Sequence, residues 1–225
     1  MGMRFLKVYL LKILIVISSL GGVLISLLTA QQEGYSHWHK SLLYFTGQSN
    51  LWIGLTTLAL LITLLFFRRK IKVVRALYFL KFVFTVSITV TAIVFFCFLA
   101  PFADESYHIW SVSGFLTHLF SPLFSVIDLF TDDYKLKLKS KIVFASIIPP
   151  LIYVIISAIL TCLNVDFGRG DNYPYIFMDL FSPAGLFGFS KEPPIFGAVY
   201  WILFFALITA TVGLTYYQIK SKRQK

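Results

Sequence analysis

The sequence predicts an all-α, polytopic integral membrane protein with six transmembrane helices and both termini in the cytoplasm. Of its 225 residues, 58% are hydrophobic and 13% are charged, whereas a soluble domain carries about 25% charged residues. Apolar runs of roughly 20 residues, the length that a helix needs to cross a bilayer, recur along the whole chain. We therefore treat residues 1–225 as a single transmembrane domain.

The distribution of basic residues gives the orientation. With six spans, 17 of the 20 Lys and Arg residues fall on the side that carries both termini, and the other side carries Lys40, Arg169 and Lys191. Such an excess marks the cytoplasmic side. The net charge of +10 is therefore a topology signal, and we expect no nucleic-acid partner.

The first span is expected at about residues 8–30. Its basic start and apolar middle resemble a signal peptide, but the apolar run is long. A cut after Ala30 would also place Leu28, rather than a small residue, three positions before the cleavage site. We therefore expect this segment to remain as the first helix.

The other spans follow from apolar runs that end at basic residues, prolines or loops. They are expected at about residues 42–67, 77–100, 109–130, 142–163 and 195–219. Lys81, near the start of the third span, is expected to reach the interface by snorkelling. Pro122 is expected to kink the fourth span one turn below His118.

Two cysteines lie near span ends. Cys97 and Cys162 are expected to be buried free thiols, as free cysteines in proteins commonly are. A disulfide between them is left open, because the sequence does not give their separation.

Two loops on the outer side carry aromatic and polar residues. The loop 31–40 holds His37 and His39, which could share a metal on a strand, but no third ligand is near; we predict an interfacial aromatic loop and no metal site. The connection 164–194 is long and rich in Gly, Pro and aromatic residues, which favours a binding loop with a short re-entrant or interfacial segment.

The stretch Tyr44–Asn50 opens the second span with a cluster of polar side chains. Such a cluster is costly in a membrane unless it faces protein or a water-filled cavity. On a helix, Thr46 and Asn50 lie on one face. A second polar intrusion, Thr117–His118, interrupts the fourth span, and we predict that Thr46 and His118 meet inside the bundle.

The depths of the two residues support this prediction. Counted from Lys40 and Ile109 as outer ends, Thr46 lies about 9 Å deep and His118 about 13 Å deep, at 1.5 Å per residue. Asp128 lies about 15 Å beyond His118 and is too far away to orient its imidazole. Asp171 and Asp179, on the outer loop, could reach the site from above.

The chemistry that this pair allows is nucleophilic acyl transfer. A hydroxyl needs an adjacent base to attack an ester, and neutral imidazole is the natural base near pH 7. The side chains of Gln48, Ser49 and Asn50 are candidates to stabilise an oxyanion. Structural roles stay open: Thr46 as a helix N-cap, and His118 as the donor or acceptor of an interhelix hydrogen bond.

Three elements occur in order on the six spans. They are Phe45-Thr46-Gly47-Gln48-Ser49-Asn50, the stretch from His118 to Asp128 with Pro122, and Tyr173-Pro174-Tyr175-Ile176-Phe177-Met178-Asp179. From about residue 40 to 215, the chain resembles the androgen-induced and androgen-dependent-TFPI-regulating family of membrane proteins, in its bacterial branch.

The resemblance implies a function and roles for particular residues. The animal members of this family are threonine hydrolases that cleave fatty acid esters of hydroxy fatty acids with a Thr and a His. Carried over, Thr46 is the nucleophile and His118 the base, with Tyr173, Tyr175 and Asp179 as outer-loop candidates. Gln48, Ser49 and Asn50 are not part of the animal pattern.

The expected function is hydrolysis of lipid esters within the cell membrane, with membrane lipids and a lipid ester as partners and no cofactor. The alternative is a lipid- or solute-binding or transport protein, in which the same polar residues line a path without cleavage. A third reading is a structural membrane partner with no pocket.

Overall fold

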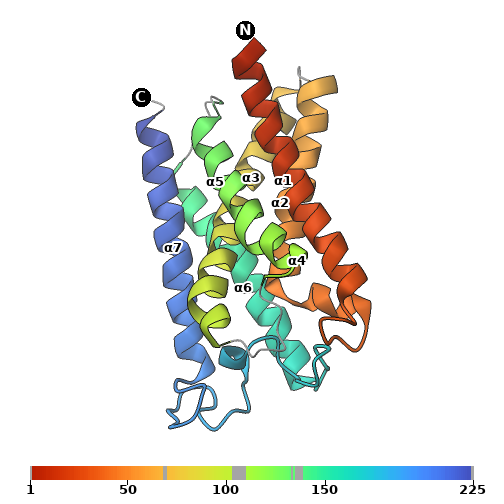
Figure 1. Ribbon diagram of the computed structural model, residues 1–225. Coiled ribbons are helices and arrows are strands. Elements are labelled where there is room, and N and C mark those ends of the chain that lie inside the picture. The colour runs from red at the N-terminus through yellow and green to blue at the C-terminus, as the bar shows by residue number, and fades with distance from the viewer. Residues whose placement is uncertain (1, 68–69, 103–109, 133, 135–138, 224–225) are drawn as a thin grey trace.

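The computed structural model describes residues 2–67, 70–102, 110–132, 134 and 139–223. Within these residues, six helical spans are long and apolar enough to cross a membrane, which confirms the predicted all-α, six-span architecture. Both termini lie at one end of the bundle (Figure 1), here called the terminal end. The opposite, loop end carries the connections that contain residues 31–44 and 163–197.

The first three spans are α1 (Gly2–Thr29), α2 (Phe45–Phe66) and α3 (Ile71–Val94). The third continues through a π-helix, η2 (Phe95–Leu99), into a 3-10 turn, η3 (Ala100–Phe102). The fourth span consists of α4 (Val112–Gly114), a second π-helix η4 (Phe115–Phe120) and α5 (Ser121–Thr131). The last two are α6 (Lys141–Cys162) and α7 (Ala198–Lys222).

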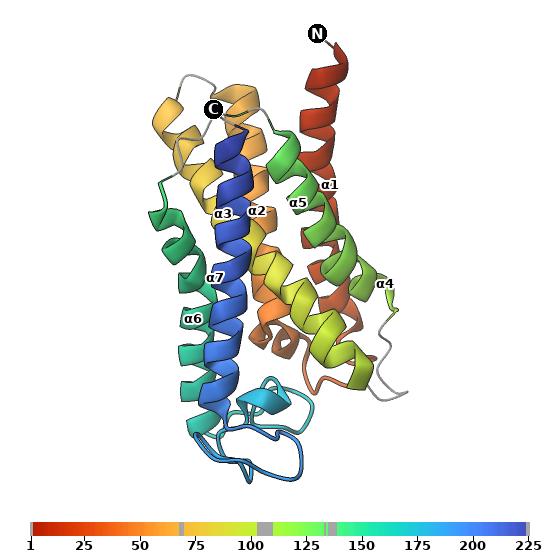
Figure 2. The same ribbon diagram turned by 90° about the vertical axis from the view of Figure 1, so that its left-hand side faces the viewer.

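The third span is the centre of the bundle. Helix α3 contacts α2, α5, α6 and α7, and the views of Figures 1 and 2 show it among them. Half of this span is buried, against 22% for α6 and 17% for α7. Helices α6 and α7 therefore turn most of their apolar side chains outward, as a surrounding bilayer allows.

The connections at the loop end shift two predicted boundaries. Residues Trp38–Leu43 wind as a 3-10 helix, η1, so α2 begins at Phe45 rather than near 42. A turn closed by an isolated bridge between Phe189 and Phe196 delays α7 to Ala198. The connection from α6 to this turn contains one short 3-10 helix, η5 (Ile176–Met178).

Parts of the predicted loops lie outside the described residues. They include Ile109 at the start of the predicted fourth span, and Asp104, Glu105, His108, Asp133, Lys135 and Lys137.

Two expectations about side chains are wrong. Lys81 is 2% exposed and pairs with Asp128 inside the bundle instead of snorkelling, because a buried carboxylate is a nearer partner than the interface. Cys97 and Cys162 are free and exposed. A thiol on the outer face of a membrane bundle meets an apolar surrounding and does not need burial in protein.

A buried ionic cluster holds the terminal end together. Lys12 of α1 donates to Asp128 at 3.1 Å and to Asp132 at 2.6 Å, and Lys81 of α3 also pairs with Asp128. The Tyr78 hydroxyl donates to Asp132 at 2.9 Å. Because each charge is buried with opposite charges around it, the cluster links α1, α3 and α5 at a depth where an isolated charge would be costly.

Helix α7 joins this end through backbone groups. The Lys220 ammonium donates to the carbonyls of Leu129 (2.9 Å) and Asp132 (2.6 Å), and Arg223 donates to the Phe130 carbonyl at 2.7 Å. The last carbonyls of a helix have no partner within it. The basic end of α7 therefore caps the C-terminus of α5.

Candidate functional site

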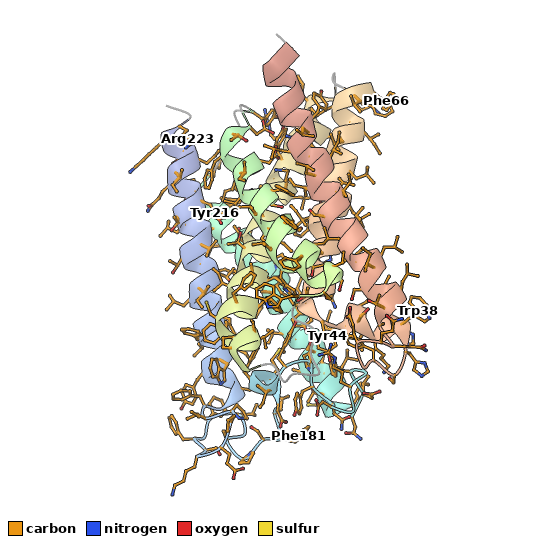
Figure 3. The ribbon with its side chains drawn as sticks, in the orientation of Figure 1. Trp38, Tyr44, Phe66, Phe181, Tyr216 and Arg223 are labelled. Carbon is orange, nitrogen blue, oxygen red and sulfur yellow. The ribbon has the colours of Figure 1, made fainter. Side chains whose placement is uncertain are left out.

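The polar stretch at the start of α2 is fixed by its first turn. Tyr44 is the N-cap residue in extended conformation, so Thr46 lies inside the first turn and is not the N-cap. The Phe45 N–H donates to the Tyr175 hydroxyl at 3.1 Å, which ties the long loop to this helix end. Figure 3 places Tyr44 at the loop end of the bundle, between Trp38 and Phe181.

His118 lies in the π-helix η4 and faces another π-helix. Its ring stacks on the Phe95 ring of η2, with centroids 3.6 Å apart and planes 8° from parallel. π-Helices inside longer helices are frequent at functional sites. Pro122, the second residue of α5, lacks the N–H that would bond the His118 carbonyl four residues earlier. A kink was expected here, and the structure has a π-helix around His118.

Asn50 connects the two halves of the site. Its side-chain nitrogen donates to the Thr46 carbonyl at 2.9 Å and to the Thr117 carbonyl at 3.2 Å. Two backbone carbonyls, one next to each candidate catalytic side chain, therefore lie within hydrogen-bond distance of one nitrogen. Asn50 is fully buried, so this bridge lies inside the bundle.

Thr46 and His118 line one cavity of about 460 Å³, here called the chamber. It extends to the loop end, where Tyr173 and Tyr175 of the long loop line it. Within the described residues, no hydrogen bond joins the Thr46 hydroxyl to the His118 ring. The two groups thus share a cavity into which a substrate carbonyl could come between them.

A second, smaller cavity begins on the other side of Thr46. This slot has a volume of about 90 Å³ and runs between α3, α6 and α7. Thr46, Leu99 and Tyr175 line both cavities, so Thr46 lies where the chamber and the slot adjoin.

The three candidate oxyanion side chains line neither cavity. Gln48 donates to the Leu42 carbonyl at 3.1 Å. The Ser49 hydroxyl lies 2.9 Å from the Thr91 hydroxyl of α3, and Asn50 forms the bridge described above. Their hydrogen bonds stabilise the start of α2 and its packing.

Backbone groups at the same turn are better placed than these side chains. Thr46 and Gly47 both line the chamber, and their N–H groups belong to the first turn of α2, where helical acceptors are missing. Such N–H groups, at the positive end of the helix dipole, suit a developing oxyanion. The sequence signal was the position of Gly47 at a helix start, directly after the candidate nucleophile.

Of the three outer-loop candidates, two line the chamber and one does not. Tyr173 and Tyr175 line the chamber, whereas Asp179 lines neither cavity and accepts a hydrogen bond from the Phe181 N–H at 2.9 Å. Burial raises the pKa of Tyr173, and the nearby Asp171 carboxylate raises it further. Tyr173 is therefore a neutral hydroxyl at the chamber wall.

Two charged residues of the chamber were not predicted as site residues. Glu33 accepts hydrogen bonds from Thr29 (2.8 Å) and Ser113 (2.9 Å). The Arg169 guanidinium lies over the Tyr35 ring, 4.4 Å from its centroid. Both line the chamber, and both lie in loops whose folding onto the bundle no helical periodicity indicates.

The described residues contain no group of three or more His, Cys, Asp and Glu side chains that could hold a metal ion. His37 and His39 stack on each other with ring centroids 5.6 Å apart, and both are exposed. They form part of the aromatic loop at this end.

Comparisons of the chain with protein-family models, with curated proteins and with solved structures found no match. The function is therefore argued from the geometry of the site.

Proposed function

We propose that the protein hydrolyses lipid esters inside the membrane, with Thr46 as nucleophile and His118 as general base. The observation that carries this proposal is that Thr46 and His118, from two different spans, line one chamber next to carbonyls bridged by Asn50. A hydroxyl, an imidazole and first-turn N–H groups belong to residues that line this one chamber, which supports the proposal because acyl transfer needs these parts.

The reaction has two halves. The Thr46 oxygen attacks the ester carbonyl while His118 takes the hydroxyl proton. The ester C–O bond then breaks, and the proton passes from His118 to the departing alkoxide. Water, deprotonated by His118, attacks the acyl-threonine and releases the acid, which restores both side chains.

The Thr46 and Gly47 N–H groups are the proposed oxyanion donors, in place of the side chains of Gln48, Ser49 and Asn50. The Phe95 ring holds the imidazole plane by stacking at 3.6 Å. A base with a fixed ring plane keeps the orientation that proton transfer requires.

The substrate class and location rest on further arguments. The resemblance to the threonine hydrolases of the androgen-induced family favours fatty acid esters of hydroxy fatty acids. The excess of basic residues at the terminal end, 17 of 20, favours cytoplasmic termini in the cell membrane. The chamber would then face the outer side, with membrane lipids as the source of substrate.

Labelling with a fluorophosphonate probe and hydrolysis of a model fatty acid ester test the proposal. Purified full-length protein should react with the probe and cleave the ester. Thr46→Ala should abolish both activities, and His118→Ala should lower both by about 100-fold or more, as loss of a general base does.

The matched control is Thr63→Ala. Thr63 lies on the same helix, is buried, and bonds the Ala59 carbonyl at 2.7 Å, so its variant should keep both activities. Labelling and cleavage that persist in Thr46→Ala would remove the nucleophile from the proposal.

A second candidate is lipid or solute binding, or transport, without cleavage. Two observations favour it. No hydrogen bond joins the Thr46 hydroxyl to His118 in the described residues, and a cavity of about 460 Å³ that Glu33 and Arg169 line also suits a solute path. Binding or movement of a lipid with no release of acid would support this candidate.

A further inference from the structure

We infer that the slot between α3, α6 and α7 is a binding site for one unbranched acyl chain, whose carboxyl end lies at Thr46 and whose tail points toward the middle of the membrane. The inference deepens the proposed function and rests on it, since it gives the acyl part of the ester a defined place. It also assigns a role to Pro150 of α6 and to Phe177 and Met178 of the long loop.

The surface of the slot is mostly apolar, although several of its residues carry polar groups. Three threonines line it: Thr46, Thr91 and Thr209. Thr91 donates to the Ser87 carbonyl of its own helix at 3.1 Å and Thr209 to the Phe205 carbonyl at 2.8 Å, so these hydroxyls are already satisfied. The Tyr153 hydroxyl and the Trp201 indole nitrogen, on two other residues that line the slot, have no hydrogen-bond partner within the described residues. Nearly all of the remaining lining surface is hydrocarbon, so the slot suits an apolar ligand.

Helix α6 provides one wall with Pro150. Proline has no N–H to offer, and its ring interrupts the helical hydrogen bonds that α6 would otherwise form. The wall at Pro150 is thus an apolar ring surface. Leu151, the next residue, also lines the slot and is 47% exposed, which places one side of the slot at the outer surface of the bundle.

The dimensions suit one chain. Along α7 the lining extends from Trp201 to Thr209, which is about 12 Å at 1.5 Å per residue. An extended chain advances about 1.2 Å per bond, so the slot matches about ten carbons. Its volume of about 90 Å³, spread over this length, leaves no room for a second chain.

The direction follows from the two cavities together. At the loop end, Phe177 and Met178 of the long loop close the slot, and the chamber lined by Arg169, Tyr173 and Glu33 extends toward the same end. Thr46 lies between them. A lipid in the leaflet at the loop end has this polarity, with its polar part toward the surface and its tail toward the middle of the bilayer.

Photo-crosslinking tests the slot by its occupancy. Purified full-length protein in lipid nanodiscs is irradiated with a fatty acid that carries a diazirine at its tail, and modified peptides are mapped by mass spectrometry. Cross-links that an excess of unlabelled decanoic acid removes are specific. We expect these at slot-lining positions of α6 and α7, such as Pro150, Ala206 and Thr209, and not at exposed positions of the same helices.

One variant fills the slot and another does not. Ala206→Trp places an indole in the slot and should lower the competed cross-linking by about tenfold or more. Leu207→Trp adds the same group to the neighbouring residue, which is 66% exposed and lines neither cavity, and should leave the competed cross-linking unchanged.

Cross-links that decanoic acid removes but that map only to exposed positions such as Leu207 would overturn the inference. The wild-type protein gives this result by itself, so the test holds even if Ala206→Trp does not fold. Ester cleavage measured on the same samples separates the two proposals. Cleavage without cross-links in the slot removes the slot alone, whereas cross-links without cleavage remove the hydrolase alone.

Discussion

Asn50 is the residue on which the geometry of the site depends most. It is fully buried, and its amide nitrogen serves the Thr46 and Thr117 carbonyls at 2.9 and 3.2 Å. Its own side-chain oxygen has no hydrogen-bond partner within the described residues. A buried amide with one unsatisfied atom costs stability. Its nitrogen, in return, bridges two helices and sets the distance between them.

Asn50→Leu should therefore damage both stability and activity. The substitution keeps the branching of the side chain but puts methyl groups in place of both polar atoms. It leaves the Thr117 carbonyl without this donor, at a cost of about 1–3 kcal/mol. Probe labelling should slow by about tenfold or more, because a small displacement of reacting groups is costly to rate. Thermal unfolding in detergent and the labelling rate measure the two effects.

Thr57→Val is the matched control. Thr57 is also fully buried on α2, and its hydroxyl is without a hydrogen-bond partner in the part of the chain that the structure describes. Removing that hydroxyl should be neutral or stabilising. Equal losses in the two variants would show that the Asn50 bridge has no special role.

The sequence indicated Thr46 and His118 because polar side chains inside apolar runs are conspicuous. It did not indicate where Gln48 and Ser49 point, because their partners, Leu42 and Thr91, depend on the turn before α2 and on the packing of α3. The contact of Phe95 with His118 could not be predicted for another reason. The chain has 24 phenylalanines, and nothing in the sequence distinguishes the one that stacks on the histidine.

At the scale of elements, α1 sets the position of the His118 segment. A Cβ on Gly22 would lie 2.7 Å from the Thr117 side chain and 2.9 Å from that of Leu116. Small residues let membrane helices approach closely. Gly22 of α1 is therefore in close contact with η4 at Thr117, the residue before His118.

Gly22→Ala should push η4 away from α1. We expect a loss of about 1–3 kcal/mol, typical of overpacking, with slower probe labelling because His118 moves with η4. The neighbouring Gly21 provides the control, since a Cβ there meets nothing within 4 Å. Gly21→Ala should be neutral or slightly stabilising in a helix, as thermal unfolding can measure, and a similar loss in both variants would contradict the close contact.

The number and type of the spans could be predicted because hydropathy and length decide them. The π-helices could not, because they depend on how η2 and η4 stack across the bundle, although Pro122 marked the place. The 3-10 start before α2 and the delayed start of α7 depend on loop hydrogen bonds that no periodicity reports.

For the whole molecule, the buried ionic cluster and the chamber lie toward opposite ends of the bundle. The ionic cluster of Lys12, Lys81, Asp128 and Asp132 fixes the terminal end, while the chamber extends to the loop end. This cluster could not be predicted from the sequence, because its four residues come from three segments that are far apart in the chain.

The ionisation of Asp132 makes the stability of this cluster depend on pH. Burial alone would raise the pKa of Asp132, but the Lys12 ammonium, the Tyr134 N–H and the Lys81 charge together outweigh burial, so the pKa lies below the ordinary value. Its ionised form therefore stabilises the fold above the ordinary carboxylate pKa, and this contribution is lost as pH falls through the folded-state value.

Asp132→Asn should be less stable at pH 7 by about 3–5 kcal/mol, the cost of breaking a buried pair. Its unfolding temperature should also change less than that of the wild type between pH 6 and pH 3, a range that includes the ordinary carboxylate pKa of about 3.9. Asp179→Asn, on the loop, should behave as wild type. A parallel acid response in wild type and Asp132→Asn would exclude the ionised Asp132 as its source.

The most direct measurement of the proposed chemistry is the position of the covalent adduct. Full-length protein is labelled with a fluorophosphonate, digested, and sequenced by mass spectrometry. We predict that the phosphonyl group is found on the Thr46 hydroxyl and that little adduct forms in His118→Ala. An adduct on another residue, or none at Thr46 in protein that still cleaves the ester, would contradict the assignment of this site.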